Sequence, residues 1–346
     1  MIPLSLRFLE AALLPESSQR VNNAMDKLSR LVGIAACVAA LAAAGCSSNS
    51  GVTPATGSPT TGSPMALQQQ ALNNQGWVYA GGMTYHVPHY MVTRQTSHPA
   101  VNPDLQIVYG NGPVLVAPKM YIIFWGYGTY GDASKVKPLL EQYAKVIGGS
   151  QYNNIYTQYY QIAGGVETYI TNPSNQFGAV WSDNANTVPL HPTHAQIAAE
   201  AIKGVAHFGY DSNGSYVVAT PHLHSSSGFG TSWCAYHSST ISDRKVISYT
   251  NLPYIPDAGA NCGANITSPP PDQTSADEGV TIVEGHEYGE SVTDPNPPTG
   301  WYNKFYGEIG DICAWRNILN DPFGSKSYTS QPMFSNASGS CVHSYP

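Results

Sequence analysis

Apolar positions in the middle of the chain alternate between the spacing of strands and the spacing of helices. Residues 114–125 (VLVAPKMYIIFW) form an almost unbroken apolar run, which is typical of a buried central strand. Residues 133–147 and 192–208 place their apolar side chains at helical spacing. Strand-like composition returns at 215–220 and 245–250. Strands alternating with helices predict an α/β fold, a mixed sheet flanked by helices on both sides.

A further helix is predicted from about Ala276 to the residues before Pro295. Ser275 and Glu278 have the spacing of a capping box, and a proline disfavours helical geometry in the residue before it. The segment 279–293 (GVTIVEGHEYGESVT) carries valine and isoleucine on one face. We therefore expect this helix to be buried.

The amino-terminal part has the pattern of an export signal. Two positive residues near Met25 precede an apolar run at 31–44, which is too short to span a membrane and ends in Ala-Ala-Gly-Cys46. That ending resembles a bacterial lipobox, in which the cysteine is lipidated; ordinary secretion with cleavage nearby is the alternative. We expect a leader and lipoprotein-type signal peptide over 1–46, with translation starting at Met1 or Met25. The predicted organisation then continues with a flexible Ser/Thr/Gly/Pro tether at 47–64, an irregular lead-in at 65–104 and one α/β domain at 105–346.

Composition narrows the class of protein. Of 346 residues, 42% are hydrophobic and only 11% charged, which excludes general disorder. The 15 Lys and Arg are outnumbered by 22 Asp and Glu and form no run, so no nucleic-acid partner is expected. Four cysteines follow Cys46, an even number that suggests two disulfides in an oxidising compartment. The shortest non-overlapping loops favour Cys234–Cys262 and Cys313–Cys341; a zinc site of four thiolates is the alternative, although the chain has no C-x2-C pair.

The chemistry concentrates in the sequence His286-Glu287-Tyr288-Gly289-Glu290. Side chains four residues apart share one face of a helix, so His286 and Glu290 can bind one metal ion together. Glu287 is then placed to act as general base on a metal-bound water, as in H-E-x-x-H metallopeptidases with a carboxylate replacing the second histidine. Glu308 or Asp311, beyond a proline-rich break, is expected to supply the third ligand. The competing interpretation is an acidic helix end with solvated carboxylates.

Other histidines have two interpretations each. His237 follows Cys234 closely and is a candidate ligand or proton donor to a developing oxyanion, or else a buried histidine beside a disulfide. His222 and His224 would share one face of a strand and could supply a ligand, or else form hydrogen bonds in a loop. Asp294 lies near the same helical face and is expected to cap the helix end.

Three segments resemble a known family. Residues 110–126 (GNGPVLVAPKMYIIFWG) and 234–239 (CAYHSS) are similar to motifs of the phosphate-induced or EXORDIUM-like proteins. Residues 285–315 resemble a bacterial branch of that family, in which an H-E-x-x-E helix is followed by T-D-P, G-W-Y and E-I-G-D-x-C. The resemblance covers about 105–345 by motif. It implies an extracellular protein, since plant members are described as extracellular growth-signalling proteins.

Together these patterns predict an exported, lipid-anchored metallopeptidase-like hydrolase with a zincin-like active-site helix. Zn²⁺ is the expected ion, and the carboxylate-rich ligand set would also admit Mn²⁺ or Ca²⁺. The expected partner is a peptide or protein substrate, and the expected membrane contact is the lipid at Cys46. The alternative is a non-catalytic surface protein that binds a cell-surface glycan or a protein and holds a structural metal.

Overall fold

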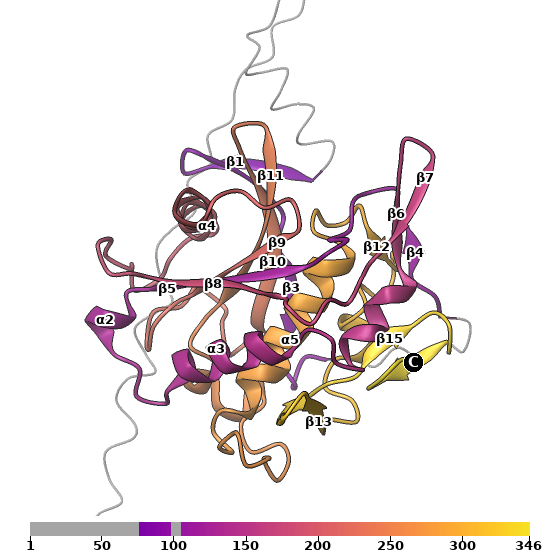
Figure 1. Ribbon diagram of the computed structural model, residues 1–346. Helices are drawn as coiled ribbons and strands as arrows, with labels where there is room; N and C mark the ends of the chain where they lie inside the picture. The colour runs from indigo at the N-terminus through magenta and orange to yellow at the C-terminus, as the bar shows by residue number, and fades with distance from the viewer. Residues whose placement is uncertain (1–75, 98–104) are drawn as a thin grey trace, which may run out of the picture. The chain divides into compact units, whose positions relative to one another are not determined.

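The computed structural model describes residues 76–97 and 105–346. Its centre is an eight-stranded mixed sheet, and the predicted α/β class is confirmed (Figure 1). The strands on the β5 side of the sheet run parallel to their neighbours, whereas β10 pairs antiparallel with each of its neighbours. In spatial order the strands are β1 (Trp77–Ala80), β2 (Met83–His86), β10 (Trp233–Ser242), β11 (Lys245–Leu252), β9 (Gly214–Ala219), β5 (Lys119–Trp125) and β8 (Phe177–Asp183), and β3 (His89–Val92) also pairs with β10.

Helices cover both faces of this sheet. The helix α4 (His194–Phe208) begins with a complete capping box at Thr193 and packs against one face. The helices α3 (Val136–Val146) and α5 (Glu278–Thr293) pack against the other face, with α5 at the centre of the larger core (Figure 1). Alternate residues of β5 divide accordingly: Ile123 belongs to the α4 core and Ile122 to the α5 core.

Smaller elements surround α5 or extend from the sheet. They are the short helix α2 (Tyr127–Tyr130), three 3₁₀ helices, and four two-stranded sheets. The 3₁₀ helices are η1 (Asn153–Gln158), η2 (Ile255–Cys262) and η3 (Asp311–Cys313); the small sheets pair β4 (Val108–Tyr109) with β12 (Trp301–Tyr302), β6 (Tyr160–Ala163) with β7 (Val166–Tyr169), β13 (Leu319–Phe323) with β14 (Lys326–Ser330), and β15 (Met333–Ser335) with β16 (Ser340–Val342).

Three expectations about local structure were wrong. The lead-in at 65–104 was expected to be irregular, yet residues 77–92 form β1, β2 and β3 and join the main sheet through β10. The strand expected over 114–125 begins only at Lys119, because the preceding residues bond outside the sheet: the Leu115 amide donates to the Val292 carbonyl. The capping box at Ser275 is absent, because the Glu278 carboxylate instead accepts hydrogen bonds from the Ile266 and Thr267 amides.

Two disulfides fasten the segments that flank α5. Cys234–Cys262 joins β10 to η2, and Cys313–Cys341 joins η3 to β16, so both predicted pairings are confirmed. Such bridges indicate an oxidising compartment. Within 76–97 and 105–346 no helix combines the length and the apolar character needed to cross a bilayer. The predicted leader, the tether and Cys46 lie outside the described residues.

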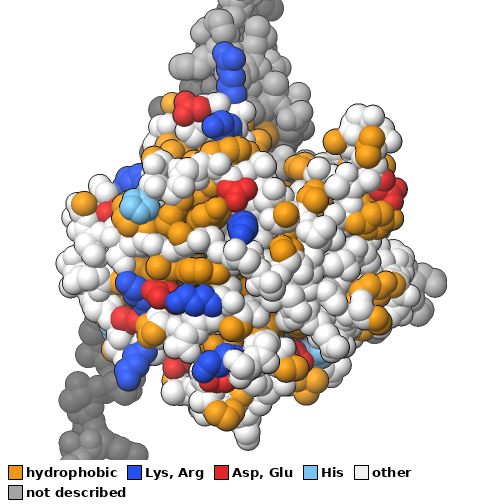
Figure 2. All heavy atoms as spheres, in the orientation of Figure 1, with side chains coloured by type: hydrophobic (Ala, Val, Ile, Leu, Met, Phe, Trp, Pro, Cys, Tyr) orange, Lys and Arg blue, Asp and Glu red, His pale blue; other side chains and the backbone are white. Residues whose placement is uncertain are grey.

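The molecular surface is mixed in charge. On the face shown in Figure 2, Lys and Arg side chains are interspersed with Asp and Glu, and small hydrophobic groups lie between them. The acidic residues of α5 are buried beneath such a surface, so they contribute nothing to it.

Candidate metal centre

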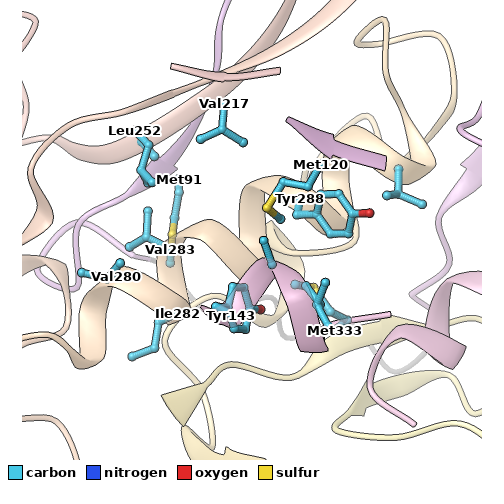
Figure 3. Close-up of a cluster of buried hydrophobic side chains, with 14 of the residues drawn as sticks. Met91, Met120, Tyr143, Val217, Leu252, Val280, Ile282, Val283, Tyr288 and Met333 are labelled. Carbon is cyan, nitrogen blue, oxygen red and sulfur yellow. The ribbon is translucent and has the colours of Figure 1, made fainter. Parts of the chain in front are cut away.

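The helix α5 is buried along its whole length, and this decides the environment of its charged residues. All sixteen residues from Glu278 to Thr293 are buried. Val283 and Tyr288 pack among Met91, Met120 and Leu252 in the apolar core (Figure 3). The acidic helix end with solvated carboxylates, the competing interpretation of the sequence, is therefore not what the structure contains.

The structure brings His286, Glu290 and Asp311 together. His286 Nε2 lies 3.0 Å from Glu290 Oε1 and 3.6 Å from Asp311 Oδ1. The Asp311 amide donates to Glu290 Oε1 at 3.0 Å, which ties η3 back onto α5 after the proline-rich break. The Asp311 side chain is 24% exposed, whereas the side chains of His286 and Glu290 are buried. These three residues can supply one ligand atom each to one ion.

His237 forms a second group with the same helix. From β10, its Nδ1 lies 3.3 Å from Glu290 Oε2 and 3.5 Å from Glu287 Oε2. Its Nε2 lies 3.4 Å from Glu308 Oε2. Glu308, one of the two predicted third ligands, is thus placed beside His237, whereas Asp311 is placed beside His286. His237, Glu287 and Glu290 can also supply one ligand atom each to one ion.

One further residue joins the cluster and was not assigned to it from the sequence. His89 on β3 places Nδ1 3.1 Å from Glu308 Oε2, and its side chain is 28% exposed. It faces His237 directly, because the β3–β10 register pairs the two residues. Asp294 follows the last turn of α5 and accepts hydrogen bonds from the Gly300 and Thr299 amides through Oδ1.

Most polar atoms of the cluster have no hydrogen-bond partner within the described part of the chain. This holds for both ring nitrogens of His237 and His286, both carboxylate oxygens of Glu287 and Glu308, and Oε2 of Glu290. In the same part of the chain, every ion pair that these carboxylates make is with a histidine. Burying carboxylates without hydrogen bonds or cations is costly, typically several kcal/mol for each ion. The cluster is therefore incomplete as a purely structural network.

Burial and mutual charge shift the pKa values of the cluster in opposite directions. Burial lowers the pKa of His286, but Glu290, Glu287 and Asp311 outweigh it and raise that pKa to about 10. Burial raises the pKa of Asp311 to about 8, with Glu290 adding to the effect. Burial also raises the pKa of Glu287, while histidines His286 and His237 overcome it at Glu290 and lower that pKa. Without a metal, protons on the imidazoles supply the positive charge that a divalent cation would otherwise bring.

His222 and His224 lie elsewhere. They follow β9 in an exposed turn, where His222 Nδ1 contacts Asp257 Oδ1 and His224 Nδ1 contacts the His222 carbonyl. Both histidines therefore form hydrogen bonds in a loop, which was the second of the two interpretations of the sequence.

Comparisons with protein-family models, with curated proteins and with solved structures give no match to this chain. The buried cluster on α5 is therefore the ground on which a function can be argued.

Proposed function

We propose that this protein is an exported metal-dependent hydrolase of the metallopeptidase type, with α5 as its zincin-like helix. The observation that carries the proposal is the group His286, Glu290 and Asp311, in which Asp311 is partly exposed and the other two are buried. Hydrolytic metal sites keep one position free for water, and three protein ligands leave the fourth position of a tetrahedral ion for it. The resemblance to the bacterial EXORDIUM-like branch adds support for an extracellular protein.

The spacing of the donor atoms fits a metal ion. Two ligands at about 2.0–2.1 Å from a tetrahedral ion lie about 3.3–3.4 Å apart. The separations from His286 Nε2 to Glu290 Oε1 and Asp311 Oδ1, 3.0 and 3.6 Å, bracket that value. Within the described part of the chain His286 Nε2 also has no hydrogen-bond partner, although a carboxylate oxygen is 3.0 Å away. The two groups are therefore close without pointing at each other, as ligands of a common ion are.

One imidazole with two carboxylates is a harder ligand set than two imidazoles with one carboxylate. It suits Zn²⁺ and also admits Mn²⁺ or Ca²⁺ more readily than a two-histidine site would. When bound, such an ion would lower the pKa of a water molecule and polarise a substrate carbonyl.

The chain's own residues would then move the proton. Glu287 follows His286 directly in α5 and is fully buried, and neither of its carboxylate oxygens accepts a hydrogen bond from a residue that the structure describes. Burial raises the pKa of Glu287, which brings this carboxylate closer to the range in which a general base works near neutral pH. We assign to it acceptance of the proton from water and its return to the leaving amine. His237 is placed to steady the Glu287 carboxylate, 3.5 Å away.

Replacing Glu287 by glutamine tests this assignment. The substitution preserves the shape of the side chain and the ligands His286, Glu290 and Asp311 while removing the proton acceptor. Turnover of fluorescein-labelled casein or of a quenched peptide library should fall by about 10²–10⁴-fold. The ion of His286, Glu290 and Asp311 should stay bound, so that metal measured by elemental mass spectrometry should not fall below about one equivalent per chain. Glu167→Gln, on the exposed strand β7, is the matched control and should change neither quantity.

The same experiment separates the competing function. Equal hydrolysis by wild type and Glu287→Gln would contradict the mechanism. Stable metal without hydrolysis of either substrate would favour the non-catalytic surface protein with a structural ion. Absence of metal from the folded wild-type protein would refute the proposal as a whole.

We also propose that the exported protein is anchored through a lipid on Cys46. The support is the lipobox-like sequence and the two disulfides, which indicate an oxidising compartment. Metabolic labelling with palmitate should tag the wild-type protein and fail with Cys46→Ser. Cys37→Ser, within the apolar run of the leader, is the control and should remain labelled. Labelling that survives Cys46→Ser would rule out this anchor.

A further inference from the structure

Glu290 presents its two carboxylate oxygens to two different sets of ligands. Oε1 lies 3.0 Å from His286 Nε2, on the side of Asp311. Oε2 lies 3.3 Å from His237 Nδ1, on the side of Glu287. A carboxylate that gives one oxygen to each of two neighbouring ligand sets has the arrangement of a bridging ligand.

The set on the Oε2 side is itself suitable for a cation. His237 Nδ1, Glu287 and Glu290 can each place one ligand atom within 4.8 Å of the others. The separations of 3.3 and 3.5 Å from His237 Nδ1 match the spacing of about 3.3–3.4 Å expected around a tetrahedral ion. His237 is fully buried, and neither of its ring nitrogens has a hydrogen-bond partner among residues 76–97 and 105–346. Because His237 comes from β10, it is an observation independent of the motif on α5.

The other side of the His237 ring faces a carboxylate, as is usual for metal-binding imidazoles. Metal-ligating histidines generally direct their second nitrogen at a carboxylate or carbonyl, which fixes the ring. His237 Nε2 lies 3.4 Å from Glu308 Oε2, and the same oxygen is 3.1 Å from His89 Nδ1. Glu308 thus lies between two imidazoles, and it leaves His237 Nδ1 free for the carboxylates of α5.

The charge of the cluster leaves room for more than one divalent cation. Four carboxylates make ion pairs with its histidines: Glu287, Glu290, Glu308 and Asp311. With neutral imidazoles, one divalent cation would leave two negative charges in a buried site. Two divalent cations would neutralise the four carboxylates. Burial of uncompensated charge is strongly unfavourable, so the second cation contributes to a stable cluster.

We propose that the centre is dinuclear, with a second divalent cation bound by His237, Glu287 and the Oε2 side of Glu290. The proposal rests on the proposed function, because it takes the ion of His286, Glu290 and Asp311 as the first. In two-metal hydrolases the ions lie about 3.5–4 Å apart, a separation that a bridging carboxylate spans. Glu287 would bind through Oε2, the oxygen nearer His237, and its Oε1 would remain available as proton acceptor.

The experiment measures the number of ions and their mutual contact. The purified full chain is stripped with a chelator and titrated with Mn²⁺, with bound metal measured by elemental mass spectrometry and the spectrum by electron paramagnetic resonance. We expect about two equivalents per chain and the broadened spectrum of an exchange-coupled pair. His237→Ala should retain about one equivalent with the hyperfine multiplet of an isolated ion, and weaken the second site at least 100-fold.

A control and a wild-type measurement keep the test independent of any one variant. His194→Ala removes a half-buried histidine on α4 that hydrogen-bonds Tyr236, and it should leave both ions in place. Saturation of the wild type at one equivalent, with an uncoupled spectrum, would overturn the second site while leaving the proposed function intact. No bound Mn²⁺ or Zn²⁺ at all would overturn both.

Discussion

Gly310 offers a perturbation of the proposed centre that changes no ligand. A methyl group on its Cα would lie 2.8 Å from His286 Nδ1 and 2.9 Å from Glu290 Oε1. The backbone angles of Gly310, φ −82° and ψ −43°, are ordinary for alanine, so any effect of Gly310→Ala arises from this contact. Ordinary contacts of a methyl carbon begin near 3.4 Å, so the ring or the carboxylate has to move by about 0.5 Å.

That displacement exceeds what metal coordination tolerates. Bonds to a metal ion hold their lengths to within about 0.2 Å. We therefore expect Gly310→Ala to weaken zinc binding about 10–100-fold, the range found when support of a ligand is lost. The crowding itself should lower the free energy of unfolding of the metal-free protein by about 1–3 kcal/mol.

The assay is competition for zinc against a chromophoric chelator, combined with urea unfolding of the metal-free protein. Gly178→Ala is the matched control, because a methyl group there would lie 2.6 Å from Tyr121 Cε1 in β5, away from the cluster. It should destabilise the fold without changing zinc affinity. Unchanged zinc affinity in Gly310→Ala would show that His286 and Glu290 do not hold the ion in the geometry described here.

Two further predictions concern stability. With free zinc at about 100 times its Kd, binding adds about 2.7 kcal/mol, so chelation should lower the Tm by about 5–10 °C in calorimetry; an unchanged Tm would argue against a bound ion. Burial raises the pKa of Glu200 on α4 to about 7, with Asp183 adding to the effect and Lys203 opposing it. Because the folded-state pKa lies above the unfolded value of 4.5, this carboxyl favours the folded state fully below pH 4.5 and ceases to as pH rises through about 7. Between pH 5 and pH 8, the free energy of unfolding of Glu200→Gln, measured with urea, should rise by about 1–3 kcal/mol relative to that of wild type. Parallel pH profiles of the two proteins would contradict this.

Local patterns were sufficient where a segment has one face in the core. The helix α4 follows its apolar spacing and its Thr193 cap, and β5 follows its apolar run from Lys119 onward. They failed at Glu278, where the sequence suggested reciprocal capping. The carboxylate there accepts hydrogen bonds from the amides of Ile266 and Thr267, which lie 12 and 11 residues earlier in the chain. Competition between local and more distant partners for one carboxylate cannot be settled from spacing.

In the site, too, the local contacts could be predicted from the sequence and the long-range contacts could not. The pairing of His286 with Glu290 is local, since four residues of helix fix it, and the motif alone predicts it. The choice between Asp311 and Glu308 depends on how the chain returns after α5, and the contact of His89 with His237 depends on the register of β3 against β10.

Sheet register and chain reversal are set by the whole core, and in this protein they gather charge around a fully buried helix. The cluster holds four carboxylates whose ion pairs with described residues are all with histidines, and metal ligands that are buried in this way are also structural elements. Metal binding should therefore be coupled to folding. The final packing of β10 and η3 against α5 brings the carboxylates close to one another, and either protonated imidazoles or bound cations must offset their repulsion. This coupling explains why the motif on α5 predicts only part of the site, and why β3, β10 and η3 supply the remaining residues.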